Sequence, residues 1–276
     1  MPALPRTRGI LNGVQRPPVI IGGFYRSGTS LLRRILDSHS GIHCGPEVKF
    51  MRDFFGDYPH DPLAHVRLFA TARTYGLPED HLLATFGRAF VTFHEEAAAA
   101  AGKARWADKA PENVLFLDAW RTVLPAGFRF IELVRDPLDA LTSLDEIGFP
   151  KTVPASLADR VALYAHFREA GTRQLRNWPK SSIQVSYESL VTSPQRTVQA
   201  LMDWLGEPFE ANMLQAINSP ERRRGIEDPK AHLHATVHAH SVGRGLRQMP
   251  TQSQHFIREQ LAPYLATPHD QRPHVS

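Results

Sequence analysis

The fold is indicated first by one stretch, Pro18-Val-Ile-Ile-Gly-Gly-Phe-Tyr-Arg-Ser-Gly-Thr-Ser-Leu-Leu-Arg-Arg-Ile-Leu36. An apolar run over residues 19–21 predicts a buried strand, and the spacing of the apolar residues after Ser30 predicts an amphipathic helix. Between them lies a turn that reads Gly23-x-x-x-x-Gly-Thr-Ser30. Consecutive backbone N–H groups in such a turn bind anions, because the positive end of the helix lies behind them. The stretch therefore predicts a strand, a phosphate-binding turn and a helix.

This turn differs from a nucleotide-binding P-loop at one decisive position. Thr29 stands where a P-loop carries Lys, and the cation of the turn is Arg26 instead. We therefore expect the turn to bind a phosphate-like group. It fits a nucleoside triphosphate with its metal ion poorly.

Composition limits the classes of protein that the chain can belong to. Of the 276 residues 42% are apolar, which is typical of a globular protein. The formal net charge of +4 is too small to indicate a nucleic-acid partner. The single cysteine, Cys44, excludes an intrachain disulfide and favours a reducing compartment. The sequence shows no secretory signal and no apolar run long enough to cross a bilayer, so we predict a cytoplasmic protein without a membrane span.

Strands alternate with helices along the chain. We predict further strands within residues 42–50, 105–111, 128–134 and 182–187, and helices over 113–124, 137–144, 156–178, 194–205 and 251–265. Residues 51–102 are predicted to be irregularly helical, and the polar, histidine-rich residues 225–250 to be a mobile loop. The pattern predicts an α/β fold with a mostly parallel central sheet. Residues 1–17 are expected to be a flexible lead-in, and residues 18–276 a single domain.

Charged residues follow four of the predicted strands. They are Arg26, Glu47, Lys109 and Arg135. In a parallel sheet the carboxyl ends of the strands meet at one edge, so these side chains are expected to gather there. Asp139, shortly after Arg135, is interpreted as an acid at the start of a helix, where the helix dipole favours it.

Five motifs carry a resemblance to a known family. They are Gly22-Gly-Phe-Tyr-Arg-Ser-Gly-Thr-Ser30, Cys44-Gly-Pro-Glu47, Asp108-Lys109, Glu132-Leu-Val-Arg-Asp-Pro137 with Ser143, and Tyr187-Glu-Ser-Leu190. In this order they resemble the sulfotransferases that use 3′-phosphoadenosine 5′-phosphosulfate (PAPS), and are most similar to the tyrosylprotein sulfotransferase branch and its bacterial relatives. The resemblance implies the P-loop-like sulfotransferase architecture, and transfer of a sulfuryl group from PAPS to an acceptor hydroxyl with release of PAP.

The resemblance also implies roles for single residues. The 5′-phosphosulfate would be bound by Arg26, Ser27, Gly28, Thr29 and Ser30, the 3′-phosphate by Arg135 and Ser143, and the adenine side by Tyr187, with Arg244 as a further cofactor contact. Glu47 would be the general base, and Arg26 and Lys109 would stabilise the charge that develops during transfer. Because fixed cations do this, no metal is expected.

The sequence leaves several alternatives open. A P-loop phosphotransferase acting on a small molecule would bind ATP with magnesium, and a non-catalytic nucleotide-binding protein would bind PAP without turnover. The acceptor hydroxyl could belong to a tyrosine, a phenol, a carbohydrate or a lipid, and the oligomeric state stays open. The sequence also does not decide whether residues 225–250 close over the site, or whether residues 222–224, three consecutive arginines, contact an acidic acceptor. His232, His234, His238 and His240 fit no standard metal site.

Overall fold

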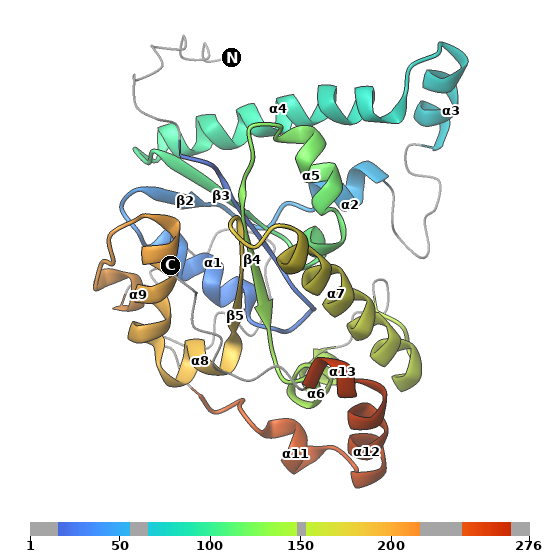
Figure 1. Cartoon of the computed structure of the whole chain (residues 1–276), viewed down its shortest axis with the longest axis vertical. Coiled ribbons are helices and arrows are strands. Elements are labelled where there is room, and N and C mark those ends of the chain that lie inside the picture. Colours follow the sequence, from blue (N-terminus) through green and yellow to red (C-terminus); the bar gives the residue numbers. More distant parts are fainter. Residues whose placement is uncertain (1–15, 56–65, 148–152, 216–238, 266–276) are drawn as a thin grey trace.

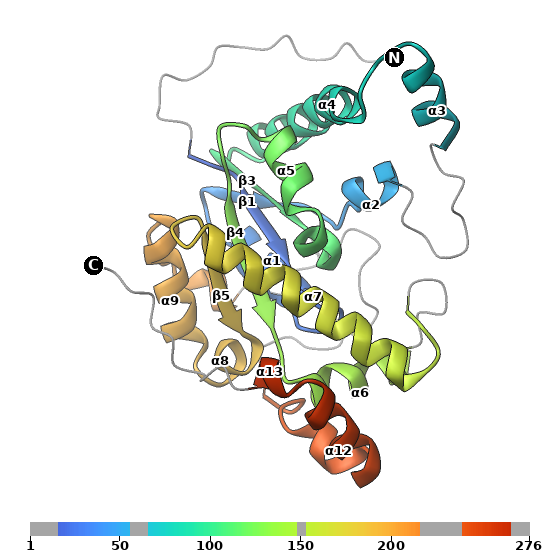
Figure 2. The same cartoon turned by 45° about the vertical axis from the view of Figure 1, so that its right-hand side comes forward.

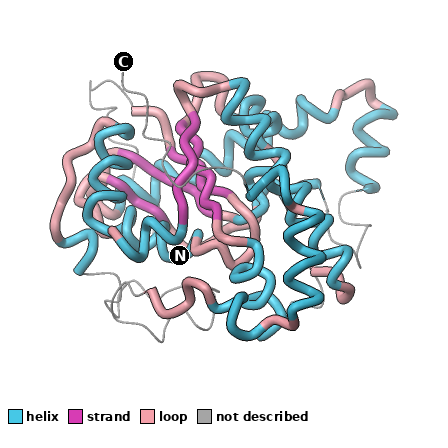
Figure 3. The backbone as a smooth tube through the Cα atoms, turned by 60° about the horizontal axis from the view of Figure 1, so that its bottom comes forward, coloured by secondary structure: helices cyan, strands magenta, loops and turns pink. Residues whose placement is uncertain are grey.

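A single parallel sheet forms the centre of the computed structural model, which describes residues 16–55, 66–147, 153–215 and 239–265. Its five strands lie in the order β2-β3-β1-β4-β5, and every neighbouring pair is parallel. The strands are β1 (Val19–Gly22), β2 (Ile42–Cys44), β3 (Arg105–Lys109), β4 (Arg129–Val134) and β5 (Ser182–Ser186). Helices cover both faces of this sheet (Figures 1 and 3). The predicted α/β class is confirmed.

The helices connect these strands in the order that the sequence predicts, but they are shorter and more numerous than predicted. They are α1 (Thr29–Asp37), α2 (Phe50–Phe55), α3 (Val66–Thr74), α4 (Glu79–Ala100), the 3-10 helix η1 (Pro111–Leu115), α5 (Leu117–Val123), α6 (Pro137–Ile147), α7 (Leu157–Asn177), α8 (Tyr187–Thr192), α9 (Pro194–Leu205), α10 (Asn212–Gln215), α11 (Arg244–Gln248), α12 (Thr251–Gln260) and α13 (Ala262–Leu265). The chain thus returns across the sheet by helices, as parallel pairing requires.

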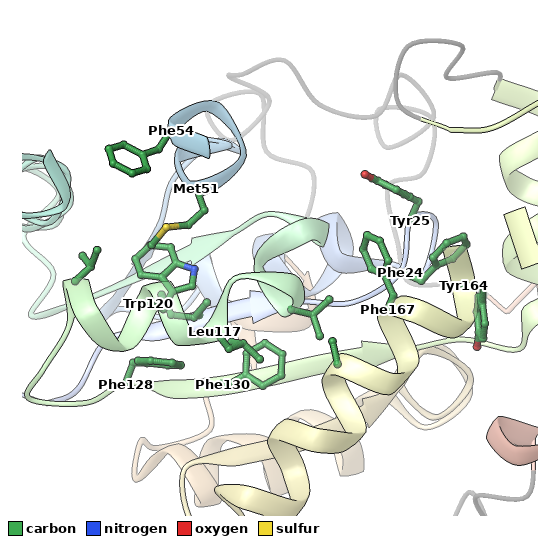
Figure 4. Close-up of a cluster of buried hydrophobic side chains, with 14 of the residues drawn as sticks. Phe24, Tyr25, Met51, Phe54, Leu117, Trp120, Phe128, Phe130, Tyr164 and Phe167 are labelled. Atoms are coloured by element: carbon green, nitrogen blue, oxygen red, sulfur yellow. The ribbon is translucent and has the colours of Figure 1, made fainter. Parts of the chain in front are cut away.

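Two apolar cores lie on the two faces of the sheet. Consecutive residues of β1 divide between them: Ile20 packs with Trp120 and Phe130 in one core, and Ile21 packs with Leu32 in the other. This division follows from the alternation of side chains along a strand. The first core is rich in aromatic rings and lies beneath α5 and α7 (Figures 2 and 4). Burial on both faces fixes the strand register and therefore the positions of the loops at the strand ends.

Four predicted elements differ from the structure. The single helix predicted over residues 113–124 is two, the 3-10 helix η1 and α5, which meet at Phe116. The single helix predicted over residues 251–265 is two helices, α12 and α13, because Pro263 lacks an N–H and its ring is not tolerated inside a helix. The predicted loop over residues 225–250 contains α11, and residues 225–238 of it lie outside the described residues. The short helix α8 has no predicted counterpart, although the Ser186 hydroxyl caps it by accepting from the Ser189 N–H at 3.2 Å.

Candidate active site

The predicted phosphate-binding turn joins β1 to α1 in a conformation that needs its glycines. Gly23 and Gly28 have φ angles of 144° and 92°. A Cβ at Gly23 would lie 2.2 Å from the Leu133 carbonyl oxygen, and one at Gly28 would lie 2.5 Å from the Tyr187 ring. The turn therefore passes tightly against the carboxyl end of β4 and the start of α8, and side chains at these positions would force it away.

One group of predicted residues gathers where β2 and β3 end, and we call it the β2–β3 side: Glu47, Lys109 and Ser30. The Lys109 side chain is fully buried and forms an ion pair with the Glu47 carboxylate. Its Nζ also donates to Ser30 Oγ at 3.2 Å. The structure thus brings a carboxylate, an ammonium and a hydroxyl of the turn together, as the sequence predicts.

Behind this group lies a charged cluster that the sequence reasoning missed. A single Glu112 carboxylate oxygen accepts from Tyr25 Oη at 2.9 Å, Lys49 Nζ at 3.0 Å and Arg52 Nη1 at 2.6 Å. Lys49 Nζ also lies 3.5 Å from Glu47. Burial alone would raise the pKa of Glu112, but the Lys49 and Arg52 charges and a backbone hydrogen bond lower it below its ordinary value. Glu112 is therefore a buried anion that holds two cations, one of them beside Glu47.

A second group gathers where β4 and β5 end, and we call it the β4–β5 side: Arg26, Ser143, Arg135 and Tyr187. Arg26 has a left-handed backbone, with φ 63°, and its Nε donates to Ser143 Oγ at 3.1 Å. Arg135 Nη1 donates to the Arg26 carbonyl at 2.9 Å, and its guanidinium lies 4.4 Å from the centre of the Tyr187 ring. Burial lowers the pKa of Arg135. The turn thus lies between two groups, and the Arg26 side chain extends to the second.

Two buried polar atoms of this region lack a hydrogen-bond partner among the described residues. They are the Ser27 hydroxyl oxygen, in the turn, and Arg135 Nε, on the β4–β5 side. Buried polar groups usually have a partner, and these two donors are available to a ligand. A hydroxyl and a guanidinium N–H both donate to phosphate oxygens, and the glycines leave the backbone of the turn open to close approach. The residues present therefore fit an anion with phosphate groups.

The remaining predicted residues belong to neither of the two groups. Thr29 is buried at the first position of α1. Arg244 lies at the start of α11, where its Nη1 is 3.2 Å from a Glu146 carboxylate oxygen. Residues 222–224, His232, His234 and His238 lie outside the described residues.

Comparison with known proteins identifies the chain. Residues 17–211 match the model described as "Sulfotransferase family". The chain belongs to the sulfotransferase family. This sulfotransferase is 24% identical over 206 residues to a Caenorhabditis briggsae protein named "Putative protein-tyrosine sulfotransferase", a match covering 71% of this chain and 68% of that protein. The resemblance drawn from the motifs is confirmed.

Solved structures support the fold of this sulfotransferase. The sulfotransferase domain of the olefin synthase from Synechococcus PCC 7002 is 18% identical with a TM-score of 0.60, covering 92% of this chain and 98% of that one. Mouse sulfotransferase SULT7A1 complexed with PAP is 11% identical with a TM-score of 0.51, covering 92% of this chain and 86% of that one. At these identities the likeness shows the fold alone. Within the described residues, no helix combines the length and the apolar character that crossing a membrane requires.

Proposed function

We propose that this sulfotransferase moves a sulfuryl group from PAPS to an acceptor hydroxyl and releases PAP. The observation that carries the proposal is the contact of Lys109 with both Glu47 and Ser30 beside the phosphate-binding turn. A carboxylate for the acceptor proton and a cation for the departing phosphate are the two groups that such a transfer needs, and both lie beside one turn. The mouse neighbour that carries PAP has the same fold, which supports this choice of donor.

Each group has a defined task in the proposed reaction. PAPS supplies the sulfuryl group. PAP is the leaving group, and negative charge develops on its 5′-phosphate oxygen during the transfer. Glu47 accepts the proton of the acceptor hydroxyl as the new bond forms. Lys109 has no exposed side-chain surface, so its charge acts in a medium of low polarity, where it stabilises an anion more strongly than in water. Arg26 keeps its predicted role as a second cation, held by Ser143 on the β4–β5 side.

Donor selection is assigned to the β4–β5 side. Arg135 donates from Nη1 and Nη2 to backbone carbonyls, its Nε has no partner, and no carboxylate lies within ion-pair distance of it among the described residues. An anion that lacked the 3′-phosphate would leave the Arg135 charge without a partner, which disfavours ATP. We therefore propose that Arg135 and Ser143 bind the 3′-phosphate, Tyr187 lies beside the adenine, and Arg244 is a further contact. The turn residues Ser27, Gly28, Thr29 and Ser30 bind the 5′ end.

The acceptor is proposed only as a class, a hydroxyl. The curated relatives are named as protein-tyrosine sulfotransferases, so a tyrosine peptide is the first acceptor to assay. Phenols, carbohydrates and lipid alcohols complete the panel.

The proposal is tested by binding and turnover together. A thermal-shift assay should show stabilisation by PAP and little by ATP with magnesium. Incubation with PAPS and the acceptor panel should then release PAP and form a sulfate ester with one acceptor class. Binding of ATP with magnesium, but not of PAP, would instead support a phosphotransferase. Tight PAP binding with no ester from any acceptor would support a non-catalytic protein.

A further inference from the structure

Asp139 makes a contact that its position at the start of α6 does not predict. Its side chain is almost completely buried, and its two carboxylate oxygens accept from the backbone N–H groups of Gly243 and Gly245, at 2.7 and 2.6 Å. These glycines lie about a hundred residues away in the sequence, at the start of α11. We call Asp139, Gly243 and Gly245 with these two hydrogen bonds the α6–α11 clasp.

The contact is not a capping contact of the helix that carries Asp139. The first turn of α6 is capped by Asp136, whose Oδ1 accepts from the N–H groups of Leu138 and Asp139, at 2.8 and 3.2 Å. The Asp139 carboxylate is therefore available to α11. Hydrogen bonds from N–H groups to an ionised carboxylate are about twice as strong as those between neutral groups.

The glycines of the clasp are required by its geometry. Gly243 has a φ angle of 71°, in the left-handed region that favours glycine. A Cβ at Gly245 would lie 2.4 Å from the carbonyl carbon of Leu138 and 2.5 Å from its oxygen. The segment thus packs directly against the backbone of α6, and one added methyl group would separate them.

The clasped segment contacts the β4–β5 side of the site. The Ser241 carbonyl accepts from Arg135 Nη2 at 3.0 Å, and Ser241 Oγ lies 2.7 Å from Tyr187 Oη. Arg244 is paired with Glu146 of α6. Three residues proposed as cofactor contacts therefore touch, or belong to, a segment whose position depends on Asp139. Figure 1 shows α11 beside α6, at the end of the molecule to which β4 points.

We propose that Asp139 is a positioning residue for donor binding, because its carboxylate fixes residues 241–245 as a wall of the cofactor site. The proposal rests on the proposed function. Through Ser241, the clasp orients the Arg135 guanidinium and the Tyr187 ring. Asp139 touches no reacting group, so its loss should affect donor binding and spare the transfer step.

Two substitutions break the clasp in different ways. Asp139→Asn removes the charge and offers one acceptor where two N–H groups need partners. Gly245→Ala keeps the carboxylate and pushes the segment off α6. Hydrogen exchange of the Gly243 and Gly245 amides should become at least about tenfold faster in both, while the β1 amides keep their protection. The dissociation constant for PAP and the KM for PAPS should each rise roughly tenfold in both, with kcat unchanged.

Asp145→Asn is the matched control, because Asp145 also belongs to α6 and pairs with Arg160, away from the clasp. It should leave the amide exchange rates, the dissociation constant for PAP, the KM for PAPS and kcat unchanged. Fast amide exchange with unaltered PAP affinity in both clasp variants would overturn the proposal. Weaker PAP binding in Asp139→Asn alone would also overturn it, since the charge and not the position of the segment would then be responsible. If the unchanged chain does not bind PAP, both the proposed function and the role of Asp139 in donor binding are wrong. The exchange rates of the Gly243 and Gly245 amides still show whether the α6–α11 clasp exists.

Discussion

The β2–β3 side and the β4–β5 side of the phosphate-binding turn treat positive charge in opposite ways. On the β2–β3 side Lys109 pairs with Glu47, and in the cluster behind it Arg52 and Lys49 pair with Glu112. On the β4–β5 side Arg135 donates to backbone carbonyls and contacts the face of a ring. A paired carboxylate suits proton transfer, whereas a cation held by neutral groups keeps its charge for an anion. The difference supports separate roles, transfer on one side and donor recognition on the other.

The largest expected effect is on the β2–β3 side. Glu47→Gln keeps the size of the side chain but removes the base, so the transfer rate should fall by about 10²–10⁴-fold. The affinity for PAP should stay unchanged, because the β4–β5 side is intact. Turnover with PAPS and titration with PAP measure the two effects. Glu96→Gln, at an exposed position of α4, is the control. Full activity of the Glu47 variant would remove the base assignment.

The next effect concerns the stability of the charged cluster behind the β2–β3 side. Glu112→Gln leaves Arg52, whose side chain is only 5% exposed, without its carboxylate. Breaking a buried ion pair in this way should lower the free energy of unfolding by about 3 kcal/mol. Urea unfolding of this variant and of Glu96→Gln measures it, and the control should change by less than about 0.5 kcal/mol. Equal stability of the two would show that the cluster is not held by charge.

A smaller effect is expected for donor recognition. Arg135→Met removes the cation that the two backbone carbonyls hold, so PAP should bind less favourably by about 2 kcal/mol. The affinity for adenosine 5′-monophosphate, which lacks the 3′-phosphate, should change much less. The ratio of the two affinities separates loss of phosphate recognition from general disturbance of the site. Arg173, exposed on α7, provides the matched control, Arg173→Met. An unchanged ratio in Arg135→Met would contradict the assignment.

The smallest effect is a dependence on pH. Glu112 has a folded-state pKa below its ordinary value of 4.5, so its charge stabilises the fold fully above 4.5. This contribution is lost as the pH falls through the folded-state pKa. The difference in unfolding free energy between the unchanged chain and Glu112→Gln should therefore be constant above pH 4.5 and shrink below it. Unfolding at several pH values on both sides of 4.5 measures this, and a difference that is constant throughout would show that the pKa is not lowered.

The sequence predicted the parts of the molecule that follow from local patterns. The apolar runs that are buried on both faces indicated the strands, and glycines at positions without room for a Cβ indicated the turn. The gathering of Glu47 with Lys109 followed from the strand ends of a parallel sheet. That gathering is confirmed, while the catalytic and binding roles stay predictions.

Contacts between distant segments could not be predicted in this way. Glu112 lies in a 3-10 helix and carries no motif, and its three donors come from the turn and from the region of α2. The direction of the Arg26 side chain depends on a left-handed backbone angle that non-glycine residues adopt rarely. Asp139 was interpreted as an acid favoured by the helix dipole, because its partners in α11 lie far along the chain. By contrast, Pro263 is a local signal from which the break between α12 and α13 could have been predicted.

The strand order also determines when the site can form during synthesis. Of the five strands of the sheet, β1 is synthesised first, yet Ile20 pairs with Asp108 of β3 on one side and with Phe130 of β4 on the other. Contacts this distant in sequence make folding slow, and a nascent chain that ends before β4 has an open edge on its central strand. The phosphate-binding turn is thus synthesised early, but it reaches its final packing only after β3 and β4 have paired with β1. Truncated chains that end between β3 and β4 should therefore aggregate or require chaperones.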